Sequence, residues 1–302
     1  MFSSLQTAAA GVAAALVFSV LAGGASAQAT FRNQEGAIHF MYTPAYARQI
    51  GRVPDRNAGE MEYFGGPVFK SVQVVSVIWG NKVNTQTVAD MPGFLRAIPN
   101  STFMDMLGEY STKGVKGVNG RIGHRIIKRG TFLGQYVIQP QHKGSTIKDE
   151  AIHDELEYQI ANGNLPANTT EVLYMIYFPP GVTIKAFGLQ SCSSFGAYHF
   201  ATMKRPRSTN IYYGVMPDCG YSFDSHTIIS AHEFAEATSD DIPTPGTNPA
   251  YPQAWNNAQG YEIGDLCEGT QGQLTTKKHT YYVQQVYLNS TAACSTGNYT
   301  SP

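Results

Sequence analysis

The sequence predicts an α/β or α+β fold built around a single core with a mixed sheet. Two observations support this prediction. Short runs rich in β-branched and aromatic residues alternate with helical segments, without a fixed period or an internal repeat. The four cysteines all lie in the C-terminal half, where disulfides would join the loops. We expect residues 65–302 to form one catalytic-type domain, which is large enough to fold around its own core.

The first 27 residues have the pattern of a secretory signal peptide. They contain no charged side chain, an apolar stretch over 8–21 and a small-residue run that ends at Ala27. A membrane anchor is the alternative, but the apolar stretch is shorter than the ~20 residues that a membrane-spanning helix needs. We therefore expect residues 1–27 to be removed and 28–64 to form an extended N-terminal segment or a propeptide. The mature chain would be secreted to the extracellular space or the periplasm.

Runs of β-branched and aromatic residues predict the strands of the core. The apolar run over 171–178 is typical of a central strand, and the segment 125–138 of a strand pair that turns near Gly130. Strands or strand pairs are predicted at 68–80, 125–138, 171–178, 198–203, 210–216 and 274–288.

Spaced apolar residues predict the helices. Helices are expected twice within 86–107 and once each over 148–160 and 225–239. Pro92 and Pro99 interrupt the first region, which is why two short helices are expected there. Ser225 or Asp224 is the expected N-cap of the last helix.

The four cysteines predict two disulfides in an exported protein. Three pairings exist, and we favour the sequence-local one, Cys192–Cys219 and Cys267–Cys294. Each would close a loop of about 27 residues, which stabilises the fold by about 3 kcal/mol in the chain-entropy account. A zinc site made of the four cysteines is the alternative, but the sequence contains no C-x-x-C pair.

Charge and composition exclude some classes of partner. The formal net charge is −1, and the lysines and arginines are scattered, so we expect no nucleic-acid binding. After the first 27 residues no stretch is long and apolar enough for a membrane span, so we expect no membrane association and a soluble monomer.

The segment His232-Glu233-Phe234-Ala235-Glu236 is the main candidate for chemistry. On a helix, His232 and Glu236 lie one turn apart on the same face and can bind one metal ion together. Glu233 is rotated by about 100° from His232 and can reach a water molecule as a general base. This is the arrangement of the H-E-x-x-H zinc proteases, with a carboxylate in place of the second histidine.

A catalytic zinc ion needs a third protein ligand and an open position. The segment 260–267 supplies two candidates, Glu262 and Asp265, and the residue that does not bind zinc would orient His232. We prefer Glu262 as the ligand, with Asp265 left open. Tyr261 is the candidate for stabilising an oxyanion.

Less specific interpretations compete with this one. His232 and the carboxylates could form a hydrogen-bonded cluster without metal, and Glu262 and Asp265 could each serve in a cap or a turn. His199, on a predicted strand, could reach the site, although we favour a packing or surface role for it. His226 points about 120° away around the helix and is not an expected ligand. The remaining histidines also favour surface or packing roles: His39, His124, His142, His153 and His279.

Several of these segments together resemble a known family. They are Gly65-Gly66-Pro67-Val68, the strand that ends Ile78-Trp79-Gly80, the Cys192…Cys219-Gly220 pair, and the stretches IISAHEFAEATSD and EIGDLCEG. The combination resembles the Exordium / phosphate-induced protein family of plant cell-wall proteins and its secreted microbial relatives, over residues 60–295. The resemblance implies an exported α/β protein with zincin-like local geometry. The stretch from Cys192 to His199 departs from the family's Cys-Gly-aromatic-His.

The sequence thus predicts a secreted zinc-dependent hydrolase, a metallopeptidase that binds one Zn²⁺ and acts on protein or peptide substrates. Its ligands would be His232, Glu236 and Glu262 or Asp265, with Glu233 as the base. Two alternatives stay open: a non-catalytic secreted wall- or matrix-associated protein of the Exordium type, and a glycoside-acting enzyme, because paired acids leave no short signature.

Overall fold

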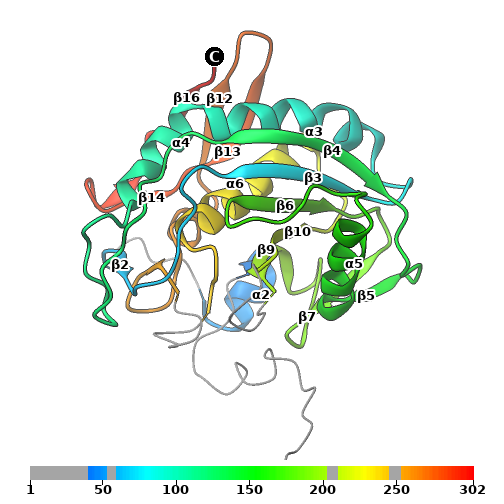
Figure 1. The fold of residues 1–302 in the computed structure, drawn as a ribbon, viewed down its shortest axis with the longest axis horizontal. Helices are drawn as coiled ribbons and strands as arrows, with labels where there is room; N and C mark the ends of the chain where they lie inside the picture. The colour runs from blue at the N-terminus through cyan, green and yellow to red at the C-terminus, as the bar shows by residue number, and fades with distance from the viewer. Residues whose placement is uncertain (1–39, 53–58, 203–209, 245–252) are drawn as a thin grey trace, which may run out of the picture.

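The computed structural model describes residues 40–52, 59–202, 210–244 and 253–302, and a six-stranded sheet forms its centre (Figure 1). In order across the sheet, the strands are β1 (Met41–Tyr42), β9 (Phe195–Ala201), β10 (Tyr212–Met216), β6 (Val172–Tyr177), β3 (Gln73–Trp79) and β4 (Thr131–Ile138). The last four run parallel, whereas β9 is antiparallel to both β10 and β1. The sheet is therefore mixed, and the predicted fold class is confirmed.

The two central strands are buried on both faces, as their apolar sequences predict. All six residues of β6 are buried. Because side chains alternate along a strand, they enter two separate cores. Leu173 and Met175 belong to one core, and Tyr174 and Ile176 belong to the other. The sheet is thus the middle layer of the fold.

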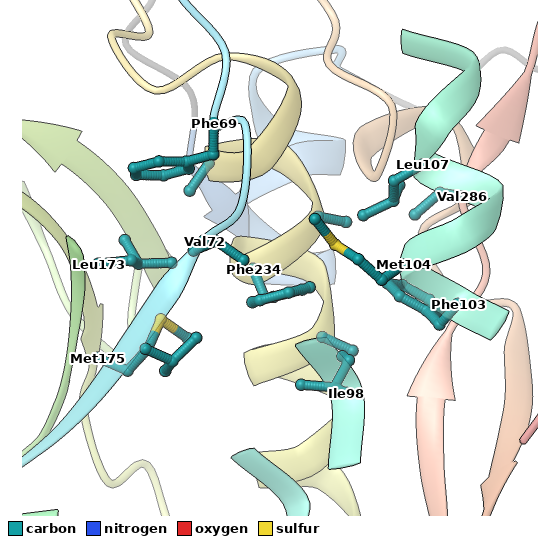
Figure 2. Close-up of a cluster of buried hydrophobic side chains, with 14 of the residues drawn as sticks. Phe69, Val72, Ile98, Phe103, Met104, Leu107, Leu173, Met175, Phe234 and Val286 are labelled. Carbon is teal, nitrogen blue, oxygen red and sulfur yellow. The ribbon is translucent and has the colours of Figure 1, made fainter. Parts of the chain in front are cut away.

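Three helices cover the first face: α3 (Thr85–Ala97), α4 (Thr102–Leu107) and α6 (Phe223–Ser239). Figure 2 shows Phe234 of α6 between Val72, on the sheet side, and Met104 of α4. Every residue of α6 from Ile229 to Ser239 is buried. This part of the helix is therefore enclosed, and any polar side chain on it must find a partner inside the protein.

The predicted break at Pro92 is wrong, because α3 continues through this residue. Proline has no backbone N–H, so Pro92 cannot donate to the carbonyl of Val88 one turn earlier. The Gln135 side chain of β4 donates to that carbonyl instead, at 2.9 Å. The helix ends before Pro99, which lies in a 3-10 turn, η1 (Ile98–Asn100). A second turn, η2 (Gly108–Tyr110), follows α4.

Two further expectations about local structure are wrong. Residues 125–130 form no strand, because β4 pairs in parallel with β3 and not as a hairpin with its own preceding segment. The N-cap of α6 is Ser222, whose Oγ accepts a hydrogen bond from the backbone N–H of Ser225 at 3.2 Å. Ser225 and Asp224 lie within the first turn instead.

Smaller elements surround the sheet. The helix α5 (Asp149–Ala161), predicted from sequence, covers the second face together with β5 (Thr146–Lys148), β7 (Thr183–Ala186) and β8 (Leu189–Gln190). The hairpin predicted over 274–288 is present a few residues earlier, as β12 (Gln271–Thr275) and β13 (Thr280–Gln284). The remaining strands are β2 (Glu62–Tyr63), β11 (Trp255–Asn256), β14 (Tyr287–Leu288), β15 (Ala293–Cys294) and β16 (Asn298–Thr300).

The N-terminal segment is less extended than the sequence suggests. Where the structure describes it, this segment contributes β1 to the main sheet, the short helix α2 (Pro44–Gln49) and β2. Thr43 caps α2 by accepting a hydrogen bond from the backbone N–H of Tyr46 at 3.3 Å. The predicted signal peptide, residues 1–27, lies outside the described residues.

Both favoured disulfides are present. Cys192 pairs with Cys219, and Cys267 pairs with Cys294, each at a sequence separation of 27. Because disulfides form and persist in oxidising compartments, they indicate a location outside the cytoplasm. In the part of the chain that the structure describes, no helix has the length and apolar character needed to cross a membrane.

A buried acid–base pair lies where α5 meets the sheet. Asp149 is 1% exposed, and its carboxylate accepts hydrogen bonds from Tyr198 Oη and Tyr213 Oη at 2.5 and 2.8 Å. His153 Nε2 is 3.2 Å from the same carboxylate. Burial opposes both charges, but their mutual attraction outweighs it, so the pKa of Asp149 is lowered and the pKa of His153 is raised.

This pair predicts a pH-dependent contribution to stability. Asp149 stabilises the fold above the unfolded pKa of about 3.9 and loses this effect as the pH falls. His153 stabilises it below about 6.5 and loses this effect as the pH rises through its raised pKa. We expect His153→Gln to cost about 1–3 kcal/mol in urea unfolding at pH 5.5 and clearly less at pH 9. The exposed His142→Gln is the control, and an equal cost at both pH values would contradict the assignment.

Candidate metal centre

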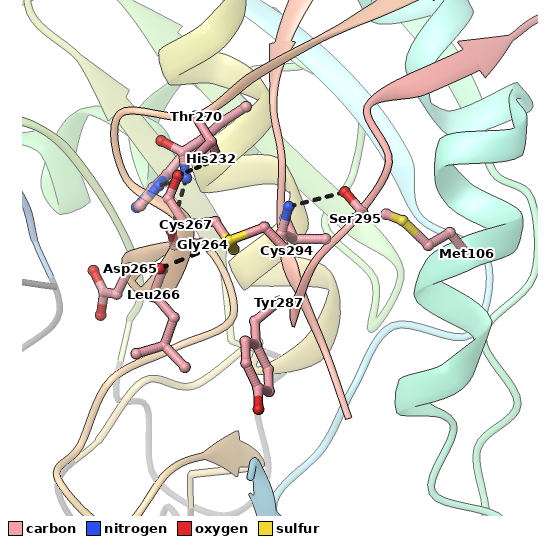
Figure 3. The surroundings of a disulfide bond; sticks show 12 residues. Met106, His232, Gly264, Asp265, Leu266, Cys267, Thr270, Tyr287, Cys294 and Ser295 are labelled. Carbon is pink, nitrogen blue, oxygen red and sulfur yellow. Dashed lines mark hydrogen bonds between the residues drawn. A yellow bond between two sulfur atoms is a disulfide. The ribbon is translucent and has the colours of Figure 1, made fainter. Parts of the chain in front are cut away.

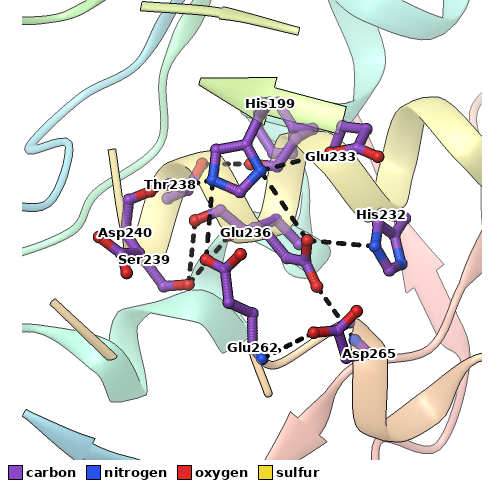
Figure 4. A network of polar contacts seen from close by, with 12 residues as sticks. His199, His232, Glu233, Glu236, Thr238, Ser239, Asp240, Glu262 and Asp265 are labelled. Carbon is purple, nitrogen blue, oxygen red and sulfur yellow. Dashed lines mark hydrogen bonds and ion pairs between the residues drawn. The ribbon is translucent and has the colours of Figure 1, made fainter. Parts of the chain in front are cut away.

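The centre is built on α6, where His232 and Glu236 lie one turn apart (Figure 4). His232 Nε2 is 3.1 Å from Glu236 Oε2, as the i, i+4 spacing allows. The two side chains are 0% and 1% exposed. The helix therefore brings both candidate ligands to one buried point.

The turn η3 (Asp265–Cys267) and the residues before it bring the acidic pair to the same place. The backbone N–H of Asp265 donates to Glu236 Oε1, and the backbone N–H of Glu262 donates to Asp265 Oδ2, both at 3.0 Å. Ligand atoms of His232, Glu236 and Asp265 all lie within 4.8 Å of one another. Zinc holds nitrogen and oxygen ligands at ~2.0–2.2 Å, so small side-chain movements would close this set on one ion.

Glu262, the preferred third ligand from sequence, occupies a different side of the cluster. It is 0% exposed, and its Oε1 lies 3.6 Å from His199 Nε2. The grouping that contains His232 and Glu236 includes Asp265 and not Glu262. The choice between the two carboxylates stays a prediction, and this geometry favours Asp265.

His199 belongs to the cluster, although sequence reasoning favoured a packing or surface role. Its Nδ1 lies 3.3 Å from Glu233 Oε2 and 3.8 Å from Glu236 Oε2. Its Nε2 lies 3.1 Å from the backbone carbonyl of Asp240, to which an N–H at this position donates. The signal in the sequence was a lone histidine within a strand, Phe195–Ala201, whose other six residues are uncharged and whose seven residues are all buried.

Glu233 belongs to α6, and its side chain lies against His199, next to the candidate ligand set. Its Oε2 faces His199, whereas its Oε1 makes no hydrogen bond with any residue that the structure describes. The side chain is 1% exposed. A buried carboxylate oxygen in this state requires a proton, a water molecule or a cation as a partner.

Gln284 and Gly264 contact His232 on its Nδ1 side, opposite the Nε2 atom that faces Glu236. Gln284 Nε2 lies 2.8 Å from both His232 Nδ1 and the carbonyl oxygen of Gly264. A Cβ atom on Gly264 would lie 2.7 Å from Glu236 Oε1 and 2.8 Å from His232 Nδ1. Its backbone angles, φ −77° and ψ −40°, are ordinary, so the close approach alone requires glycine. Neither residue was identified from the sequence.

Arg52 connects the N-terminal segment to the centre. Its Nη2 lies 3.5 Å from Asp265 Oδ2 and donates to the carbonyl of Gly260 at 2.9 Å. The guanidinium also lies 4.4 Å from the centre of the Tyr261 ring. The ring of Tyr261 therefore stacks on Arg52, and its role in oxyanion stabilisation stays a prediction.

Burial and the surplus of carboxylates control the pKa values. Burial alone would lower the pKa of His232, but the carboxylates, first Glu236, raise it to about 10. Burial raises the pKa of Glu233 to about 8 against the charge of His232, and it raises the pKa of Glu262 well above its ordinary value. Burial lowers the pKa of His199 to about 4, so this imidazole is neutral at pH 7.

These residues fit a divalent cation. His232 Nε2 makes no hydrogen bond within the described residues, despite its contact with Glu236, and Glu233 Oε1 makes none either. The raised pKa values mean that the carboxylates retain protons, which a divalent cation would replace. The imidazole of His232 and the carboxylates of Glu236 and Asp265 form a donor set that zinc accepts. The composition, burial and spacing therefore agree with a metal site.

The disulfides fix the segments that carry these residues. Figure 3 shows the Cys267–Cys294 bond beside Asp265, Gly264 and His232. The Cys192–Cys219 bond joins the residues just before β9 to the residues just before α6. His226 is directed elsewhere, since its Nδ1 lies 3.1 Å from Thr87 Oγ1.

Comparisons of the chain with protein-family models, curated proteins and solved structures yield no match. The function must therefore be argued from the geometry of the centre.

The close approach at Gly264 yields a test of the centre. We expect Gly264→Ala to push His232 and Glu236 apart and to weaken zinc binding at least about 10–100-fold. Zinc affinity measured by competition with a chromophoric chelator checks this. Gly108→Ala is the matched control, because a Cβ there meets no atom closer than 3.8 Å. Unchanged zinc affinity in Gly264→Ala would show that these two side chains do not bind the metal together.

Proposed function

We propose that this chain is a secreted zinc-dependent peptidase. One observation carries the proposal: His232 and Glu236 meet at a buried point, while Glu233 lies beside them with an oxygen directed to no protein partner among the described residues. A purely structural metal site has no use for such a carboxylate. His232, Glu236 and Asp265 would hold the ion, with Glu262 as the alternative third ligand.

Zinc held by these residues would supply two effects, a lower pKa of a bound water, to about 7, and polarisation of the substrate carbonyl. The protein's own part is proton transfer. With a cation nearby to favour its ionised form, Glu233 would accept a proton from the attacking water and deliver it to the leaving amine as the peptide bond breaks. His199 is neutral and has Nδ1 directed at Glu233, so it can accept a hydrogen bond from the protonated carboxyl group. Tyr261 is the proposed donor to the carbonyl oxygen.

The export signal and the disulfides support a secreted location for this peptidase. Residues 1–27 have the pattern of a signal peptide, and both disulfides require an oxidising compartment. The resemblance to the Exordium / phosphate-induced protein family stays part of the proposal, since it too implies an exported protein.

A second candidate function is a non-catalytic secreted protein that uses the metal only for stability. The observation that favours it is the burial of the proposed ligands. Even the most exposed of them, Asp265, has only 6% of its surface exposed. A peptide substrate would need to enter from the side or displace a covering segment. Glu233 distinguishes the two functions.

The central test replaces Glu233 by an isosteric amide. We expect the wild type to bind one equivalent of zinc and Glu233→Gln to retain it. Hydrolysis of a mixed protein substrate should fall about 10²–10⁴-fold, because a general base is lost. His232→Ala should lose both zinc and activity.

Elemental analysis of the purified proteins measures the metal, and peptide release measures the activity. Glu150→Gln, an exposed carboxylate on α5, is the control and should change neither. Full activity with zinc in Glu233→Gln would exclude the proposed base, and a wild type that binds zinc without any hydrolysis would favour the structural function.

His199 yields a separate prediction as a positioning residue. We expect His199→Phe to retain zinc but to lower kcat about 10–100-fold with little change in KM, because Glu233 loses its hydrogen-bond partner. His199→Gln, which keeps an acceptor, should recover part of kcat. Loss of zinc from both variants would instead identify His199 as a ligand.

A further inference from the structure

An open cavity of about 240 Å³ lies next to the metal centre. Its walls come from β1 and the following residues, from the first half of α6 and from the segment 268–271. Most of the wall is apolar, with Met41, Tyr221 and Ile228 among its residues. The cavity is open, although the proposed metal ligands themselves are buried.

Gln284 connects this cavity to the centre. It lines the cavity, and its Nε2 lies 2.8 Å from His232 Nδ1. The cavity is therefore one side chain away from a proposed zinc ligand. A group bound in it would lie near the proposed centre, on the Nδ1 side of His232.

Glu268 is the single charged residue among those that line the cavity. It follows η3 directly, and the adjacent Cys267 is anchored by its disulfide to Cys294. Among the described residues, no lysine, arginine or histidine forms a salt bridge with Glu268. The cavity thus offers a carboxylate, at a position fixed by a cross-link, that a ligand's charge could pair with.

We infer that this cavity binds the side chain of a lysine or arginine in the peptide substrate, with Glu268 as its counter-ion. The apolar wall suits the methylene stem of such a side chain, which packs along apolar surfaces. The carboxylate suits its charged end, through a charge-assisted hydrogen bond. The inference rests on the proposed peptidase function and adds a substrate class to it.

Binding tests the cavity independently of catalysis. The probes are acetyl-lysine amide and acetyl-arginine amide, with acetyl-norleucine amide as the neutral ligand of similar shape, titrated calorimetrically into the zinc-loaded protein. We expect the two basic ligands to bind at least 10-fold more tightly than the neutral one, and Glu268→Gln to remove this difference. Ile228→Trp should block all three by filling the cavity, while Glu150→Gln should change nothing.

Peptide cleavage separates this inference from the proposed function. The wild type should cleave a peptide library next to lysine or arginine, and Glu268→Gln should lose this preference at least 10-fold while still cleaving other sites. Charge-dependent binding without cleavage of any peptide would overturn the peptidase function and keep the cavity assignment. Cleavage without preference for basic residues, together with equal binding of the three ligands, would overturn the cavity assignment alone. Thermal unfolding of Glu268→Gln confirms that the variant is folded.

Discussion

The rest of the structure depends on the burial of several ionisable side chains beside one helix. His199, His232, Glu233, Glu236 and Glu262 are each at most 1% exposed. An isolated charge in such surroundings costs several kcal/mol, so these groups persist only when they are mutually paired, protonated or bound to a cation. The sheet, α3, α4 and β13 all pack around α6, and this enclosure keeps the cluster away from water. Bound protons or a cation therefore stabilise this part of the fold.

The residues of this cluster that could be predicted are those that lie close together in the sequence. His232, Glu233 and Glu236 could be placed together because one helical turn relates them. The acidic segment at Glu262 and Asp265 was found by composition, but its separation from the helix left the third ligand undecided. His199 and Gln284 lie 34 and 52 positions from the helix residues that they contact, and only strand pairing brings them there. No local pattern carries that information.

In the fold, too, features set by local sequence were predictable, and features set by distant residues were not. Strands with strong apolar runs, such as Val172–Tyr177, were found, because burial on both faces dictates their composition. The error at 125–138 arose because the partner of β4 is β3, a parallel strand more than fifty residues earlier, and parallel pairing leaves no turn signature. The error at Pro92 has a similar origin, since the side chain that compensates it, Gln135, belongs to a distant strand.

The positions of the two disulfides have a consequence for how the protein can be obtained. Cys267 lies two residues after Asp265, and Cys192 lies at the start of the loop into β9. In a reducing cytosol these bonds would not form, and the segments that carry Asp265 and His199 would lose their cross-links. Material produced there would then lack a constraint on two segments of the candidate centre. The number of free thiols in a preparation should therefore be measured together with its activity.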